Sequence, residues 1–141
     1  MPAKDEYSVD TDLGRIDLFK VHHWLSTDAF WALGRSLETV QRAADGSLNF
    51  GVYDRTGDLC GYARVVTDRA TFAWLCDVYI DRQFRGRGLG RFLAQEVVDT
   101  LSPMQLKRVL LSTVDAHGLY ERVGFTPFPD PQKLMILNGA R

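Results

Sequence analysis

The sequence has few cysteines, no long apolar run and almost no net charge. Its two cysteines, Cys60 and Cys76, lie in strand-like segments without a CxxC spacing, so we interpret them as buried reduced thiols and expect no zinc site. No apolar run approaches the roughly 20 residues of a membrane-spanning helix, and the first ten residues, MPAKDEYSVD, contain no apolar signal region. A formal net charge of -1 argues against general nucleic-acid binding. We therefore expect a cytoplasmic protein that binds neither nucleic acid nor membrane.

The length of 141 residues predicts one domain over residues 1–141, long enough to bury a proper core. A short strand could lie near residues 6–12. Apolar side chains at helical spacing follow Asp17, and a second helical pattern follows Ser36, which we interpret as a helix N-cap. The segment between these helices carries two adjacent aromatic residues, Phe30 and Trp31. The first third of the chain is thus predicted to be two helices joined by an aromatic loop.

The remaining pattern predicts an α+β fold with layered strands and helices. Three strand-like runs joined by short turns form an antiparallel meander. A helical crossover then leads to a strand that should lie parallel to the last strand of the meander. The segments are, in order, strands at 48–53, 59–66 and 71–80, a helix at 89–101, a strand at 109–113, a short helix at 118–123 and a last strand at 134–137.

The stretch 81–91 (DRQFRGRGLGR) contains four arginines and three glycines between a predicted strand and a predicted helix. Closely spaced glycines let several N–H groups point at one spot, and a helix N-terminus adds partial positive charge. The stretch is therefore predicted to bind phosphates. A P-loop is excluded because no GxxxxGK[ST] string exists, and a dinucleotide fingerprint would need a third glycine where Arg91 stands.

Two motifs resemble those of one family. Gln83-x-x-Gly86-x-Gly88 is similar to the Q/R-x-x-G-x-G/A motif of the GNAT N-acetyltransferases, in which backbone amides hold the pyrophosphate of acetyl-CoA. About thirty residues further on, the segment 116–125 (AHGLYERVGF) resembles the A-x-x-L-Y-E-x-x-G-F segment of that family. The two motifs occur in the family's order, with the expected elements between them.

The resemblance implies the GNAT fold, a mixed and mostly antiparallel sheet flanked by helices. This sheet would splay apart between the strand ending near Ile80 and the strand at 109–113. The resemblance also implies an acyltransferase that moves an acetyl group from acetyl-CoA, its co-substrate, to a primary amine of a small molecule or peptide. Transfer would occur by direct attack in a ternary complex, without a metal ion, and a homodimer is compatible with it. A non-catalytic acyl-CoA-binding sensor and a nucleotide-binding protein remain as alternatives.

By the same resemblance, backbone groups at the end of the last meander strand would pair with acetyl-CoA, and the glycine loop would hold its pyrophosphate. Thr113 stands where many members have an asparagine that contacts the cofactor arm, so the sequence does not establish whether this contact is kept. The cofactor-binding residues implied are Val78, Tyr79, Ile80, Arg85, Gly86, Arg87, Gly88, Leu89, Gly90, Arg91 and Thr113.

Tyr120 matches the family tyrosine that donates a proton to the departing thiolate, and a phenol with a pKa of about 10 is protonated at neutral pH. Asp77 is a candidate general base, since an acid within an apolar strand should have a raised pKa. Strand alternation would point Asp77 away from the cofactor unless a bulge intervenes. Asp77 could equally be a structural partner of Arg64. His117, together with the nearby Asp115, is a candidate for a proton path.

In this fold the acceptor pocket is usually formed by the first two helices and the loop between them. His22, Phe30, Trp31 and Arg35 are therefore the candidate pocket residues. The two aromatic side chains could stack on the acceptor or form a cation–π cage, or they could simply cover the sheet. Arg35 could recognise a carboxylate of the acceptor.

Overall fold

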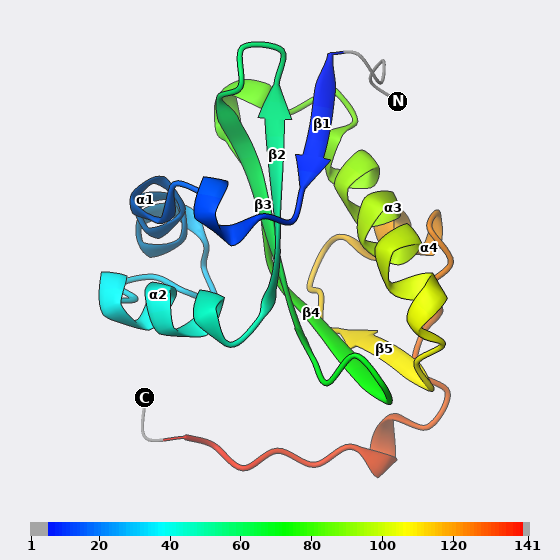
Figure 1. The fold of residues 1–141 in the computed structure, drawn as a ribbon. Coiled ribbons are helices and arrows are strands. Elements are labelled where there is room, and N and C mark those ends of the chain that lie inside the picture. The colour runs from blue at the N-terminus through cyan, green and yellow to red at the C-terminus, as the bar shows by residue number, and fades with distance from the viewer. Residues whose placement is uncertain (1–5, 140–141) are drawn as a thin grey trace.

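The computed structural model describes residues 6–139. Its five-stranded sheet has the order β1-β2-β3-β4-β5; neighbouring strands are antiparallel except for the parallel pair β4–β5. Helices α1 and α2 cover one face of the sheet, and α3 and α4 cover the other (Figure 1). The elements are β1 (Tyr7–Asp10), α1 (Leu18–Asp28), α2 (Leu37–Asp45), β2 (Leu48–Asp54), β3 (Leu59–Thr67), β4 (Phe72–Ile80), α3 (Leu89–Leu101), β5 (Arg108–Leu111) and α4 (His117–Glu121).

The N-terminal helices begin where their capping residues predict. The side chain of Asp17 accepts a hydrogen bond from the backbone N–H of Lys20, and the side chain of Ser36 accepts one from Thr39. Each cap satisfies a backbone donor that the first helical turn leaves without an intrahelical partner. The predicted boundaries at Asp17 and Ser36 are therefore confirmed. Within residues 6–139, no helix is both long and apolar enough to cross a bilayer.

Each face of the sheet carries its own hydrophobic core. On the α3 face, Leu75 of β4 packs with Leu93 and Val97 of α3. On the α1–α2 face, Trp24 of α1 packs with Tyr79 of β4, and their rings are stacked with centroids 5.4 Å apart. One strand, β4, therefore contributes large side chains to both cores.

A bulge in β4 determines which side chains reach which face. The register between β3 and β4 shifts after the Tyr62–Tyr79 pair, and Asp77 has a φ of 52°. This is a left-handed backbone conformation that residues other than glycine rarely adopt. Beyond the bulge, Val78 and Ile80 pack on the α3-side core, whereas Asp77 contacts the α1–α2 loop.

The sheet opens between β4 and β5, as expected. The two strands pair only over residues 72–75 and 108–111, and β4 then continues alone to Ile80. Strand β5 ends at Leu111, two residues earlier than the prediction of 109–113. The remaining length of β4, residues 76–80, therefore presents a free edge on this side within the described part of the chain.

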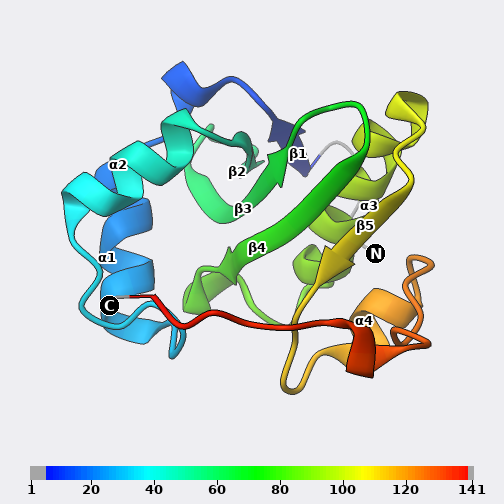
Figure 2. The same ribbon diagram turned by 90° about the horizontal axis from the view of Figure 1, so that it is seen from below.

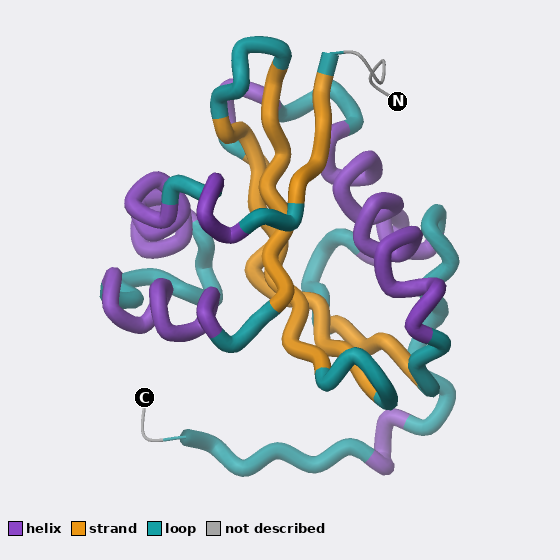
Figure 3. Tube along the Cα trace, viewed as in Figure 1, coloured by secondary structure: helices purple, strands orange, loops and turns teal. Residues whose placement is uncertain are grey.

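The last strand expected at 134–137 is the main error of the sequence prediction. After a 3-10 turn at Pro131–Lys133, this segment is extended but pairs with no strand of residues 6–139 (Figure 3). The chain instead runs away from β5 toward the side of α1 (Figure 2). An apolar segment forms a strand only where its backbone can pair with the edge of another strand. Residues 134–137 have no such strand beside them within residues 6–139.

Candidate active site

A cleft of about 790 Å³ lies where the sheet opens. Its walls come from the end of β4, the glycine loop, the start of α3, the segment around α4 and the loop after α1. Most of the predicted cofactor residues line it, namely Val78, Tyr79, Ile80, Arg85, Gly86, Gly88, Leu89, Gly90 and Arg91. The structure therefore brings together a free strand edge and the glycine loop in one cleft.

The backbone of the glycine loop leaves the N-terminus of α3 open. Gly86 and Gly88 have φ values of 80° and 78°, which glycine adopts without steric cost. Gly88 is the N-cap of α3, no side chain caps the helix, and its first turn contains no acidic residue. The N–H groups and positive dipole end of α3 are thus available to an anionic group, such as a pyrophosphate.

The arginines of this loop do not all face the cleft. Arg82, Arg85 and Arg91 line it. The guanidinium of Arg87 instead donates a hydrogen bond of 2.9 Å to the phenol of Tyr7 on β1 and lies over the ring of Phe84. The side chain of Arg87 therefore points away from the cleft, and its contact with the cofactor stays a prediction. Arg87 instead attaches the loop to the far edge of the sheet.

Sequence reasoning missed Asp28, which joins the end of α1 to the glycine loop. Its carboxylate accepts hydrogen bonds from the phenol of Tyr79 at 2.6 Å and from Arg85 at 3.3 Å, and it also forms an ion pair with Arg82. The Arg82 hydrogen bond, followed by that of Tyr79, holds the pKa of Asp28 well below its usual value. No local pattern marks Asp28, because its partners lie more than fifty residues away in the chain.

Tyr120 lies at the side of the cleft, on α4. Its ring packs edge-on against Phe125 with centroids 5.9 Å apart. Burial raises the pKa of Tyr120 to about 12, so the phenol is protonated at all physiological pH values. The short α4 lies close to α3 at Gly90, where a Cβ would lie 3.0 Å from Cδ1 of Leu119.

Asp77 is not the elevated-pKa acid that its apolar surroundings suggested. Its buried carboxylate accepts hydrogen bonds of 2.9 Å from Arg64, Arg35 and the indole of Trp31. Burial alone would raise its pKa, but the hydrogen bond from Arg64 and the charges of both arginines keep the pKa of Asp77 below its ordinary value. The alternative prediction, a structural partner of Arg64, is confirmed.

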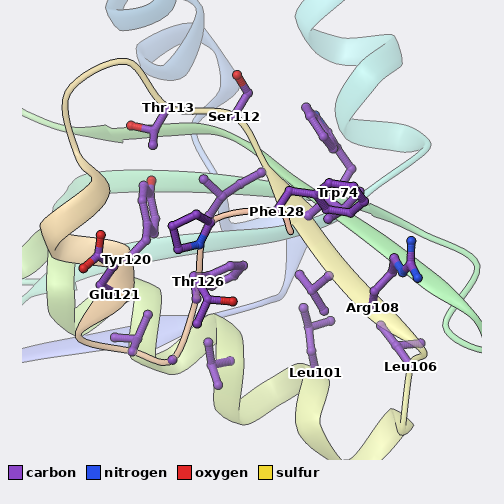
Figure 4. A pocket seen from close by; sticks show the side chains of 18 of the residues that line it. Trp74, Leu101, Leu106, Arg108, Ser112, Thr113, Tyr120, Glu121, Thr126 and Phe128 are labelled. Atoms are coloured by element: carbon purple, nitrogen blue, oxygen red, sulfur yellow. The ribbon is translucent and has the colours of Figure 1, made fainter. Parts of the chain in front are cut away.

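His117 and Thr113 lie on a second cavity, of about 960 Å³, between β5 and the C-terminal segment (Figure 4). The Thr113 hydroxyl accepts a hydrogen bond of 3.0 Å from the backbone N–H of Ala116, so it orders the turn before α4. Neither residue lines the 790 Å³ cleft, whereas Asp115 does. His117 and Asp115 therefore line different cavities, and their shared proton path stays a prediction.

The loop after α1 contributes two of the four predicted acceptor-pocket residues to the cleft. Phe30 and Trp31 line it, with their rings edge-to-face at 5.1 Å. Arg35 instead forms an ion pair with Asp77, and its side chain is only 22% exposed. His22, on α1, does not line the cleft. The expected carboxylate recognition by Arg35 is therefore not supported.

Comparison with known proteins agrees with this geometry. The model of the acetyltransferase (GNAT) family matches residues 18–125. A GNAT-family structure from Xanthomonas campestris pv. campestris is 42% identical with a TM-score of 0.90, covering 99% of this chain and 95% of that one. A Gibberella zeae protein named for acetyltransferase activity is 29% identical over 137 residues, covering 84% of this chain and 77% of that protein.

A more distant neighbour shares the fold. The Rv2747 protein of Mycobacterium tuberculosis, solved in complex with CoA, shares the fold at a TM-score of 0.71 and 20% identity, covering 86% of this chain and 72% of that one. The family match extends over most of the present sequence and includes both motifs around the cleft. The chain therefore belongs to the acetyltransferase (GNAT) family and is an acyltransferase of the N-acetyltransferase type.

Proposed function

We propose that this protein transfers the acetyl group of acetyl-CoA directly to a primary amine of a small molecule or peptide, within a ternary complex. The observation that carries the proposal is the composition of one cleft. It combines an uncapped helix N-terminus at Gly88, the free edge of β4 and the protonated phenol of Tyr120. Each of these three features suits a different part of an acyl-CoA molecule.

The N-terminus of α3 and the glycine loop would hold the pyrophosphate. Backbone N–H groups at a helix N-terminus bind phosphate oxygens, and positive side chains strengthen this attraction. Arg82, Arg85 and Arg91 are the arginines of the stretch 81–91 on the cleft wall. Arg85 is already oriented, since its Nε donates a hydrogen bond of 2.8 Å to the carbonyl oxygen of Ile80.

The free edge of β4 would bind the amide-containing arm of the cofactor. Residues 78–80 lie beyond the paired part of β4, so their backbone groups on that side have no strand partner in the described chain. Extended ligands with amide groups bind such an edge in the way that an added strand does. When bound, acetyl-CoA supplies the activated thioester carbonyl that the amine attacks.

Tyr120 would donate the proton that the departing thiolate requires. Its pKa of about 12 ensures that the phenol carries this proton at neutral pH. The ring is fixed by Phe125, so the hydroxyl has a defined position at the side of the cleft. A positioned donor accelerates proton transfer because no diffusive encounter with an acid from solution is needed.

The acceptor amine would enter beside Phe30 and Trp31, which line the cleft. We do not assign Asp77 as the base, because its carboxylate already accepts three charged or polar donors. Asp115, on the cleft wall in the segment before α4, is the acidic group that we propose to receive the amine proton, directly or through water.

A two-part assay tests the proposal. Calorimetry with CoA and acetyl-CoA measures binding, and a thiol reagent measures CoA release during incubation with a panel of amines. We expect micromolar binding and thiol release that requires one class of amine, beyond the hydrolysis seen without acceptor. Binding of acetyl-CoA without turnover on any amine would instead identify an acyl-CoA sensor, and preference for ATP or NAD would contradict the proposal altogether.

A further inference from the structure

The acceptor end of the cleft, defined as the part beside Phe30 and Trp31, presents mainly aromatic ring surface. These two residues are 63% and 45% exposed, and both line the cleft. The one polar group in the two side chains, the indole N–H of Trp31, is already donated to Asp77. Exposed apolar surface that borders a cleft marks a binding site for an apolar group. The acceptor end therefore offers contact with two rings but no hydrogen bond from either of them.

The arginines attached to this end of the cleft are already paired with acidic residues. Arg35 forms an ion pair of 2.9 Å with the buried Asp77. Arg82 and Arg85 both form ion pairs with Asp28, the last residue of α1. A carboxylate on the acceptor could gain one of these arginines only by displacing its present partner, and that partner would then lose its counter-charge.

The two other arginines of the cleft, Arg91 and Arg122, belong to its donor end, defined as the part beside the glycine loop and the start of α3. Arg91 follows Gly90 in the first turn of α3, and Arg122 is the C-cap of α4. The two helices lie close together here, since a Cβ at Gly90 would be 3.0 Å from Leu119. Both arginines are thus placed near the helix N-terminus that would bind phosphates, where positive charge serves the cofactor.

The negative charge of the cleft is small. Its acidic lining residues are Asp28 and Asp115. Asp28 is neutralised by Arg82 and Arg85, whereas Asp115 forms no ion pair with the part of the chain that the structure describes. One carboxylate can attract one ammonium group. A second cationic group on the acceptor would find only the arginines, which repel it.

We propose that the acceptor is a primary monoamine on an apolar, aromatic body, with neither a carboxylate nor a second cationic group. This inference rests on the proposed function and narrows its acceptor. The amine would lie near Asp115, and the body would pack on Phe30 and Trp31, as aromatic rings do in offset or edge-to-face contacts.

The same arrangement disfavours two other classes of amine. In an α-amino acid the carboxylate is attached to the carbon that carries the amine, so it would lie beside Asp115, where like charges repel. A lysine side chain of a peptide brings backbone amide groups to the acceptor end. The rings of Phe30 and Trp31 cannot form the hydrogen bonds that these amides lose on leaving water.

A matched set of amines tests each part of the inference, with kcat/KM calculated per neutral amine because the amines differ in pKa. Phenethylamine is the reference, phenylalanine adds a carboxylate, and phenylalaninamide adds a neutral group of similar size. Butylamine lacks the ring, putrescine adds a second cation to butylamine, and a short lysine peptide represents peptide acceptors. We expect phenylalanine to fall about 100-fold below phenylalaninamide. Butylamine should fall about 10-fold below phenethylamine, and putrescine about 10-fold below butylamine.

A charge placed on the acceptor wall should change this order. Phe30→Lys alters an exposed residue, so the fold should be kept, which circular dichroism checks. The new cation should raise the kcat/KM of phenylalanine relative to phenethylamine by about 10-fold. Leu33→Lys is the matched control, since Leu33 is 62% exposed but does not line the cleft, and it should leave this ratio unchanged.

Calorimetry on the protein–CoA complex, in which no acetyl transfer can occur, should order the amines by Kd in the same way. Preference for phenylalanine, putrescine or the lysine peptide over phenethylamine would overturn the inference and leave the acetyltransferase activity standing, as would equal ratios in Phe30→Lys and Leu33→Lys. If no amine is acetylated, the proposed function fails. A calorimetric order that still favours phenethylamine would then support the acceptor class, and any other order would overturn it.

Discussion

The indole Nε1 of Trp31 donates a hydrogen bond of 2.9 Å to Oδ1 of Asp77, which ties the aromatic loop to the bulge of β4. Trp31 lines the cleft, and the same carboxylate accepts bonds from Arg35 and Arg64. The wall on the proposed acceptor side therefore depends on one buried charge.

Replacing this charge should destabilise the fold. We expect Asp77→Asn to lower the free energy of unfolding by about 3 kcal/mol at pH 7, because it leaves two partly buried guanidinium groups without their counter-charge. The folded-state pKa of Asp77 lies below its ordinary value, so its contribution is complete above about pH 5 and is lost as the pH falls through the folded-state pKa.

Urea denaturation of wild type and Asp77→Asn between pH 8 and pH 3 measures this difference. It should stay constant down to about pH 5 and shrink below about pH 4. A difference that already declines between pH 7 and pH 5 would mean that the pKa of Asp77 is raised, and Asp77 would return as a candidate base.

Tyr120→Phe should lower kcat by about 100-fold, as expected for loss of a positioned proton donor. The affinity for CoA should be nearly unchanged, since the ring and its contact with Phe125 are kept. Because the pKa of Tyr120 is about 12, the wild-type rate should show no decline from tyrosine ionisation below about pH 10. Phe125→Leu, which loosens the ring but keeps the phenol, is the comparison; equal losses in both variants would assign Tyr120 a packing role.

Gly86→Ala should weaken CoA binding through the backbone alone. A Cβ at Gly86 would meet no atom within 4 Å, but the φ of 80° strains alanine by about 1 kcal/mol. Gly57, in the turn between β2 and β3, has a φ of 89° and equal space, so Gly57→Ala is a closely matched control. Both variants should lose similar stability, while only Gly86→Ala should raise the Kd for CoA, by about 10-fold. Equal CoA affinities would remove the glycine loop from the site.

Phe30→Ala should raise the KM for the acceptor by about 10-fold, the size of one lost aromatic contact, with the Kd for CoA unchanged. Leu33→Ala provides the control, since Leu33 is similarly exposed and near Phe30 in the chain but does not line the cleft. Steady-state kinetics with the amine identified in the screen measures the KM for the acceptor in both variants. If the two variants behave alike, the aromatic loop is only a cover for the sheet.

The sequence was most informative where the signal is local. Capping by Asp17 and Ser36 and the antiparallel meander each depend on residues within a few positions of one another, and they were confirmed. The bond between Asp28 and Tyr79 could not be predicted, because it joins positions 51 residues apart that share no pattern.

The raised pKa expected for Asp77 was wrong for a different reason. Burial alone would raise it, but the fold places the guanidinium of Arg64 on β3 within 2.9 Å of the carboxylate. In the same way, the fold brings the phenol of Tyr7 on β1 to Arg87. Residue type and strand position limit what a side chain can do. They do not specify which neighbour the folded chain brings within hydrogen-bonding distance.

The bulge at Asp77 makes β4 sensitive to its own length. Ahead of it Ala73 and Leu75 face the α3-side core, and after it Val78 and Ile80 face the same way, so one extra residue changes the odd–even order of the strand. Removing a single residue here would reverse the faces of the sheet to which residues 78–80 point. Tyr79 would then face the α3 side, and Val78 and Ile80 would face Trp24. A substitution in β4 alters one side chain, whereas a change of one residue in its length would alter both cores and the cleft together.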